Sequence, residues 1–283
     1  MKMFLRSNVA FVVWLVLCMG FYMLLFHRAL GVLAVVVIFH LISLIVAFSP
    51  VGEWLMRQMN GVRKVEILSE AGYINPLFAE VYYEASKLYP KISGNVQVFI
   101  KDEATINAYA FGTNSIVLSR GALEMLDEDQ LKGMLAHEFG HLVSGDTKML
   151  LALTIGNGFF GVIYAVMGLL VRILDFFIQV NLVRSIFSLF HLVYVLPLKS
   201  IRFVLVKIIL LMQLVSALLI GLGGRNNQFR ADEFACEMGY GEHLLSALYL
   251  LHEMNMIDDR SWLERLKAGS PLITRRIARL ERA

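Results

Sequence analysis

The chain has 283 residues, of which 58% are hydrophobic and 17% charged, and its formal net charge is +3. Soluble domains usually contain about 25% charged residues, so this composition, with a mean hydropathy of +0.65, is typical of a membrane protein. The small net charge and the lack of a basic stripe argue against nucleic-acid binding. The two cysteines, Cys18 and Cys236, lie in very different sequence contexts. A disulfide framework is therefore not expected, and a reducing compartment is favoured for the soluble part.

Two uncharged apolar runs, 9–26 and 29–51, stand near the start of the chain and are separated by a His-Arg pair. Each run is long enough to cross a bilayer as a helix. The first is long for a signal peptide and has no clear cleavage site, so residues 1–51 are predicted to form a transmembrane hairpin. Basic residues before and after the hairpin place both of its ends in the cytoplasm by the positive-inside rule.

Residues 52–148 are predicted to form the first cytoplasmic part of a catalytic domain. Apolar side chains recur at helical spacing over 76–89, and residues 96–100 alternate as in a strand. The segments 107–111 and 115–118 flank a Gly-Thr-Asn turn. This pattern predicts a β-hairpin.

The next predicted helix carries an H-E-x-x-H motif. Asp127 and Gln130 form a capping-box pattern at its start. His137 and His141 are four residues apart, so on a helix they lie on one face, about 5–6 Å apart between Cβ atoms, and can bind one zinc ion. Glu138 can then take a proton from a zinc-bound water as general base and return it to the leaving amine. The motif therefore predicts a zinc peptidase site.

Two further uncharged runs, 149–171 and 203–221, are long enough to span a membrane. They predict a second transmembrane hairpin within 149–222. The segment 172–199 between them is apolar but carries scattered charges, and it is predicted to be amphipathic and interfacial.

The glycine-rich residues 221–224 are expected to end the fourth span. The remaining chain, 223–283, is predicted to be helical and, by alternation, cytoplasmic. It would form the second part of the catalytic domain, on the same side of the membrane as the first.

A catalytic zinc site needs a third protein ligand and an open position. The metzincin pattern is disfavoured, because Ser144 and Thr147 stand where that pattern requires glycine and histidine. Another class of zinc protease takes a glutamate from a later helix. Four candidate ligands follow the fourth span: Gln228, Asp232, Glu233 and Glu237.

The segment from Asn107-Ala-Tyr-Ala-Phe-Gly112 through Ile116-Val-Leu-Ser119 to the H-E-x-x-H motif and Asp146 resembles the HtpX-like membrane zinc metalloproteases, relatives of the type I CAAX prenyl protease. The two hairpins and the closing segment Arg276-Ile-Ala-Arg-Leu280 follow the same plan. The resemblance implies an α+β membrane protein. Its mainly helical zincin-type domain would contain a small β-sheet, and four transmembrane helices would form two hairpins.

The resemblance also implies a function. The protein would bind one Zn²⁺ per chain and use it to hydrolyse membrane or misfolded polypeptides in protein quality control. The protein would lie in the lipid bilayer of the bacterial inner membrane, with its active site facing the cytoplasm.

The resemblance implies a glutamate ligand in a segment resembling E-[FY]-x-A-D. The matching segment here is Gln228-Phe-Arg-Ala-Asp232, so Gln228 stands at the ligand position. A competing register begins at Glu233, about 140° further round a helix, so the two side chains cannot face the same metal without a bend. In this alternative Glu233 completes an ordinary zinc site. Because an amide oxygen is a neutral acceptor, Gln228 should bind zinc more weakly than a carboxylate. A weak or inactive pseudoprotease that binds membrane proteins as a scaffold is therefore the alternative function.

Further residues receive predicted roles. Asp146 and Asp232 are expected to orient the ligand imidazoles, with helix-end or ion-pair carboxylates as the alternative. An extended substrate is expected to add as a strand beside four residues: Asn107, Ala108, Tyr109 and Ala110. An ordinary sheet strand is the alternative for this segment.

Overall fold

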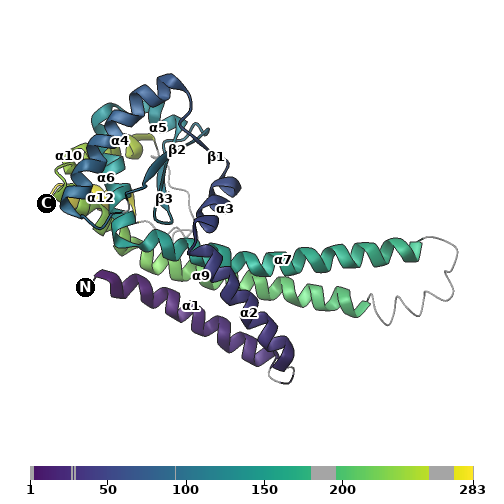
Figure 1. Ribbon diagram of the computed structural model, residues 1–283. Helices are drawn as coiled ribbons and strands as arrows, with labels where there is room; N and C mark the ends of the chain where they lie inside the picture. Colours follow the sequence, from purple (N-terminus) through teal and green to yellow (C-terminus); the bar gives the residue numbers. More distant parts are fainter. Residues whose placement is uncertain are drawn as a thin grey trace.

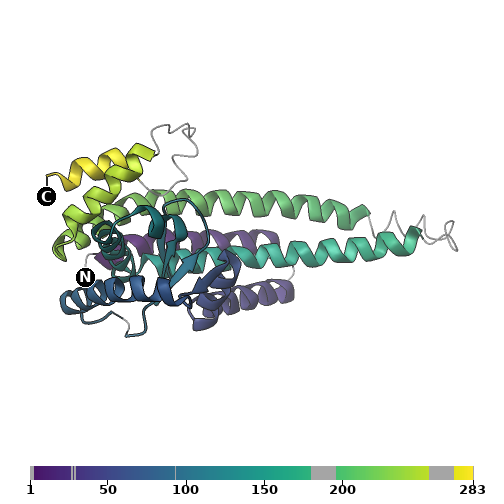
Figure 2. The same ribbon diagram turned by 90° about the horizontal axis from the view of Figure 1, so that it is seen from above.

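The computed structural model of the protein describes residues 3–26, 28, 30–92, 94–179, 196–254 and 271–282. A head, in which helices surround a small β-sheet, joins a stalk of long helices (Figures 1 and 2). The chain enters the stalk twice and returns to the head each time, so the head is assembled from two separate stretches of sequence.

Four helices form the stalk: α1 (Met3–Phe26), α2 (Leu30–Ala47), α7 (Asp146–Gln179) and α9 (Leu196–Glu237). α7 and α9 run side by side, and α1 and α2 form a shorter hairpin beside them (Figures 1 and 2). The four apolar runs of the sequence fall largely within these four helices. Side chains of α1, α2 and α7 share one buried cluster: Trp14, Cys18, Tyr22, Leu44, Ala47, Ala152 and Leu153.

Length and hydropathy single out one pair of helical segments as a candidate for crossing a membrane. Among the described residues no individual helix meets both criteria, whereas Leu33–Ala47 and Pro50–Asn60, bent by 81° from each other, meet them together.

The head contains a four-stranded sheet in the order β1-β2-β4-β3. Its strands are β1 (Val62–Lys64), β2 (Gln97–Lys101), β3 (Ala108–Phe111) and β4 (Ser115–Ser119). β2 and β4 are parallel, and the other neighbours are antiparallel. The predicted strand around residues 96–100 and the predicted hairpin are confirmed. β3 pairs with β4 alone, so the hairpin leaves β3 with one open edge.

Five helices surround the sheet: α4 (Leu68–Leu88), α5 (Arg120–Met125), α6 (Glu128–Ser144), α10 (Gly241–Met254) and α12 (Ile273–Leu280). α4 begins earlier than the predicted start at Pro76. Ile74 and Leu77 are both buried, and their packing outweighs the one hydrogen bond that a proline removes. Residues from both stretches of the head share one core, including Val81, Ile100, Leu118, Phe139, Leu244 and Leu248.

The predicted start of the motif helix α6 is confirmed. The Gln130 N–H donates to Asp127 Oδ1 at 2.8 Å, and the Asp127 N–H donates to Gln130 Oε1 at 3.1 Å. At the other end Gly145 has φ 72°, a backbone conformation that glycine adopts without steric cost. α7 starts at the next residue, so the motif helix is held between a capped start and a fixed turn.

α9 continues unbroken from Leu196 to Glu237, so the helix itself runs on through residues 221–224, where the fourth span is expected to end. A glycine costs a helix only about 1 kcal/mol relative to alanine, and α9 packs against α6 and α7 on its way into the head. The structure describes the predicted amphipathic segment 172–199 only at its two ends. Residues 172–179 belong to α7 and residues 196–199 to α9, whereas residues 180–195 lie outside the described part.

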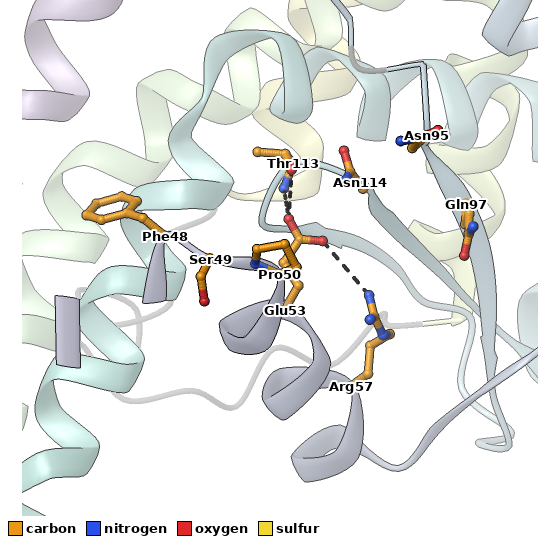
Figure 3. Close-up of a pocket in the computed structure, with 9 residues that line it drawn as sticks. All are labelled: Phe48, Ser49, Pro50, Glu53, Arg57, Asn95, Gln97, Thr113 and Asn114. Atoms are coloured by element: carbon orange, nitrogen blue, oxygen red, sulfur yellow. Dashed lines mark hydrogen bonds and ion pairs between the residues drawn. The ribbon is translucent and has the colours of Figure 1, made fainter. Parts of the chain in front are cut away.

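The sequence did not predict α3 (Pro50–Asn60) as a separate helix. The sequence nevertheless contains the usual signals of a helix start. The Val51 N–H donates to the Ser49 hydroxyl, and proline occupies the first turn. Glu53 lies on the inner face and is 7% exposed. The Thr113 N–H and hydroxyl donate to Glu53 Oε1 at 2.5 and 2.8 Å (Figure 3). The Ser115 hydroxyl donates to Oε2 at 3.2 Å. α3 thus holds the turn of the β3–β4 hairpin.

We expect Glu53→Ala to lower the free energy of unfolding by about 2–4 kcal/mol, since it removes a buried carboxylate and leaves several donors without an acceptor. The apparent Tm in detergent should fall by roughly 5–10 °C. The control is Glu84→Ala, which removes an exposed carboxylate paired with Lys87 at 3.5 Å and should change Tm little. Equal Tm values for the two variants would contradict this role of Glu53.

Candidate active site

The histidines of the motif lie together in the interior of the head. His137, Glu138 and His141 are 5%, 5% and 9% exposed. The two imidazole rings have their centroids 4.8 Å apart and their planes at 90°. This is the shared helix face that the i, i+4 spacing predicts.

α6, α9 and α10 approach one another closely at two glycines. A Cβ atom at Gly140 would lie 2.8 Å from the Ala231 Cα, and one at Gly133 would lie 2.3 Å from the Leu244 backbone nitrogen. Any larger side chain at either glycine would therefore push α9 or α10 away. The close approach at Ala231 places the neighbouring turns of α9 directly opposite the histidines.

Gln228 on α9 bridges the two imidazoles. Its amide oxygen Oε1 lies 3.2 Å from His137 Nε2, and its amide nitrogen lies 3.1 Å from His141 Nε2. The side chain therefore reaches the point on which both Nε2 atoms converge. This is the position at which the sequence resemblance expects the third ligand.

The predicted carboxylates lie on the far sides of the two rings. Asp232 Oδ1 is 2.8 Å from His137 Nδ1, and Asp146 Oδ2 is 2.9 Å from His141 Nδ1. An ionised carboxylate can only accept, so each pair favours the tautomer with the proton on Nδ1. The lone pair of each Nε2 is then directed toward Gln228. Carboxylates hold metal-binding histidines in this way.

Sequence reasoning missed Arg276 as a residue of the site. Its Nε and Nη2 donate to Asp232 at 2.9 and 2.6 Å, and its Nη2 lies 3.3 Å from His137 Nδ1. A bidentate guanidinium fixes the plane of a carboxylate, so Arg276 holds Asp232 against the imidazole. The feature that could have pointed to Arg276 is the inward face of the short basic helix α12.

The electrostatics of the site favour a neutral imidazole at His137. Burial and the nearby Arg276 guanidinium lower the pKa of His137 to about 4, despite the hydrogen bond to Asp232. Burial would raise the pKa of Asp232, but hydrogen bonds from His137 and Arg276 lower it to about 2. A neutral imidazole next to an ionised carboxylate is the state that binds a metal.

The other two groups of the motif have raised pKa values. Burial raises the pKa of the Glu138 carboxyl, and the Ala110 N–H donates a hydrogen bond to it. Burial would lower the pKa of His141, but its hydrogen bond to Asp146 raises it overall. A carboxyl group with a raised pKa is better matched to proton transfer near neutral pH.

The predicted substrate strand borders this site. The Ser119 N–H donates to the Asn107 carbonyl at 2.9 Å. Hydrogen-bonded and non-hydrogen-bonded pairs alternate along an antiparallel ladder, so Tyr109 also bonds within the sheet. Ala108 and Ala110 direct their backbone groups to the open edge instead.

A cavity of about 210 Å³ lies between this edge and α10. It is lined by polar groups of the site, His137, Glu138, Gln228 and Arg276, and by Asn107 and Ala108 of the strand segment. Its remaining wall is apolar: Ile106, Met134, Leu244, Ala247, Leu248 and Leu251. Of the predicted site residues, five line the cavity: His137, Glu138, Gln228, Asn107 and Ala108. Ala110, His141, Asp146 and Asp232 do not line it but contact residues of the site, whereas Tyr109 is not among the lining residues.

The donors present fit a zinc ion in arrangement. Two ligands about 2.0–2.1 Å from a tetrahedral ion lie about 3.3 Å apart, close to the 3.2 Å between His137 Nε2 and Gln228 Oε1. Among the described residues no three His, Cys, Asp or Glu side chains form such a group. The competing ligand Glu233 has an exposed side chain, which favours the register that begins at Gln228. The Gln228 amide lies within hydrogen-bond distance of both Nε2 atoms.

Comparison with known proteins identifies the family. The sequence profile described as peptidase family M48 matches residues 69–283. The chain therefore belongs to peptidase family M48. The resemblance predicted from the motifs is confirmed.

Individual relatives match shorter segments. The chain is 34% identical over 71 residues to a protease HtpX homologue of Bacteroides fragilis, covering 24% of this chain and 22% of the relative. It is 31% identical over 86 residues to protease HtpX of Legionella pneumophila, covering 29% of each. The matched segments thus span less than a third of these relatives. The crystal structure of S. mikatae Ste24p is similar with a TM-score of 0.49 and 18% identity, over 99% of this chain and 66% of that one.

We expect Gln228→Glu to raise zinc affinity by about ten- to a hundredfold, the usual scale of changes around a metal site, because a carboxylate adds negative charge to a neutral donor set. Competition with a zinc-binding dye, after removal of metal from the purified protein, measures this affinity. Glu233→Gln is the matched control and should leave it unchanged. A loss of affinity in the control, with no gain in Gln228→Glu, would show that Glu233 is the ligand.

Proposed function

We propose that the protein is a membrane-embedded, zinc-dependent endopeptidase that hydrolyses membrane or misfolded polypeptides in protein quality control. One observation carries the proposal. Two imidazoles, each held at Nδ1 by a carboxylate, direct Nε2 toward a common point beside a buried glutamate and an open strand edge.

His137, His141 and Gln228 would hold one zinc ion per chain. When bound, the ion supplies Lewis acidity, which activates water and polarises a peptide carbonyl. Glu138 is the group placed to take a proton from the attacking water and to deliver it to the leaving amine. Asp146 and Asp232 keep the imidazoles in the required tautomer.

The open edge of β3 supports binding of an extended polypeptide. The backbone groups of Ala108 and the carbonyl of Ala110 point away from β4, so a substrate strand can pair with them. The Ala110 N–H already donates to Glu138, which places this edge beside the general base. Main-chain pairing is largely independent of sequence, as a quality-control protease requires. The apolar wall of the cavity adds a preference for apolar side chains.

The membrane location is supported by the stalk. Large apolar side chains are exposed along it, including Ile38, Ile45, Leu169, Phe203 and Leu211, and contiguous exposed apolar surface marks a membrane or partner interface. We assign residues 1–51 and 149–222 to two membrane hairpins. Residues 52–148 and 223–283 form the two parts of the protease domain. Basic residues around the first hairpin support a cytoplasmic active site in a bacterial inner membrane.

A second candidate function has one observation in its favour. The Gln228 side chain lies between the two imidazoles, 3.2 and 3.1 Å from their Nε2 atoms, and it brings no charge to the site. This arrangement supports a pseudoprotease that binds unfolded membrane proteins at the β3 edge and releases them uncut.

Glu138→Gln separates the two functions. If the protein is a peptidase, the variant should lose cleavage of a casein-type substrate by at least about a hundredfold, since it lacks the general base, and a chelator should abolish wild-type activity. Glu128→Gln, at the exposed start of the same helix, is the control and should remain active. Equal, chelator-insensitive background rates for wild type and Glu138→Gln would support the scaffold.

Strand addition can be tested on the substrate. In a peptide with a single cleavage site, N-methylation of successive backbone amides should lower kcat/KM at every second position only, by roughly tenfold for each lost hydrogen bond. The measurement is a set of initial rates on the methylated series. A uniform effect along the peptide would contradict pairing with β3.

A further inference from the structure

α3 has an inverted distribution of side chains. Its outer face carries Val51, Trp54 and Met59, which are 56%, 53% and 68% exposed. Its inner face carries Glu53 and Arg57, which point toward the β3–β4 hairpin (Figure 3). A helix on the surface of a soluble protein has the opposite arrangement.

The inner face carries polar side chains that have polar partners, beside Met56, which packs against Phe99, Phe111 and Val117. Glu53 binds Thr113 and Ser115, and Arg57 Nη1 donates to the Ser115 hydroxyl at 3.1 Å. The Arg57 guanidinium also lies 5.0 Å from the centre of the Phe99 ring. These contacts fix the rotation of α3 about its axis. The apolar stripe is therefore held outward, away from the sheet.

The stripe continues from the exposed apolar surface of α2. Ile45 is 70% exposed and Phe48, between the two helices, is 51% exposed. α3 is bent by 81° from α2, and it lies at the junction of stalk and head (Figure 1). If α2 crosses a bilayer, a helix at this angle lies along the bilayer surface. Tryptophan is enriched at that depth.

We infer that α3 is a membrane-surface helix, whose Val51, Trp54 and Met59 side chains enter the lipid headgroup region while Glu53 and Arg57 hold the β3–β4 hairpin. The inference rests on the membrane location proposed above. The partner is the lipid bilayer, because the apolar stripe is continuous with the surface of α2. In this arrangement the lipid surface fixes the height of the β3 edge above the membrane.

The test uses the full chain in liposomes, with Trp54 as its only tryptophan after Trp14→Phe and Trp262→Phe. Lipids brominated close to the headgroup, or close to the chain end, report the depth of Trp54 by fluorescence quenching. We expect stronger quenching by the shallow bromines, at a depth of about 5–10 Å, and protection from aqueous acrylamide. The control reporter is Tyr83→Trp in a chain without other tryptophans. Tyr83 is 66% exposed on α4, and lipid bromines should not quench a tryptophan there.

Three results would overturn the inference. Stronger quenching by the deep bromines would make α3 part of a broken span. If the protection of Trp54 from acrylamide rises with protein concentration and the brominated lipids do not quench its fluorescence, the stripe is a contact between two copies of the chain. Free access of acrylamide to Trp54 would leave the stripe in water.

Carbonate extraction of the same vesicles distinguishes this inference from the membrane spans. If the protein is retained in the membrane but Trp54 is not quenched, the surface-helix inference is wrong and the membrane spans stand. Extracted protein with Trp54 quenched by the shallow bromines refutes the spans and supports the surface helix.

Discussion

The close approach of α6 and α9 at Gly140 and Ala231 is the constraint on which the site depends. At this contact a Cβ atom on Gly140 would lie 2.8 Å from the Ala231 Cα. The two helices come from stretches of sequence separated by a long excursion through the stalk. Their contact brings Gln228 to the Nε2 atoms and Asp232 to the Nδ1 atom of His137. A displacement of about 1 Å here would separate the donors and misplace the groups that catalysis requires.

A second chain of contacts runs from the stalk to the substrate edge. α2 leads into α3, Glu53 of α3 holds the hairpin turn, and Thr147 at the start of α7 donates to the Gly112 carbonyl at 2.7 Å. The hairpin is therefore fixed both from the first stalk hairpin, through α3, and from the second, through α7. The next residues of β3 include Ala110, whose N–H donates to Glu138. The position of the stalk thereby determines the position of the general base relative to the substrate edge.

Much of this arrangement could be predicted from local sequence patterns. The i, i+4 histidines, the capping box at Asp127 and the alternation in the hairpin each reflect interactions between residues close in the chain. The continuation of α9 through residues 221–224 was not predicted; a glycine costs a helix only about 1 kcal/mol relative to alanine, and α9 as a whole packs against α6 and α7. α3 was missed for a related reason. Its polar inner face makes sense only once Thr113 and Ser115 are known to face it.

The third ligand shows the same limit within the site. Spacing alone indicated that Gln228 and Glu233 could not both face the metal, and the family resemblance favoured Gln228. The exposed side chain of Glu233 agrees with that choice. Arg276 was out of reach of local reasoning, since its partner Asp232 lies 44 residues earlier in the chain.

The central claim is that His137, His141 and Gln228 converge on one metal ion. An anomalous difference map from crystals grown with zinc tests it most directly. The account predicts one peak within about 2.0–2.2 Å of His137 Nε2, His141 Nε2 and Gln228 Oε1. A peak that has a carboxylate in place of Gln228, or no peak between the histidines at saturating zinc, would contradict it.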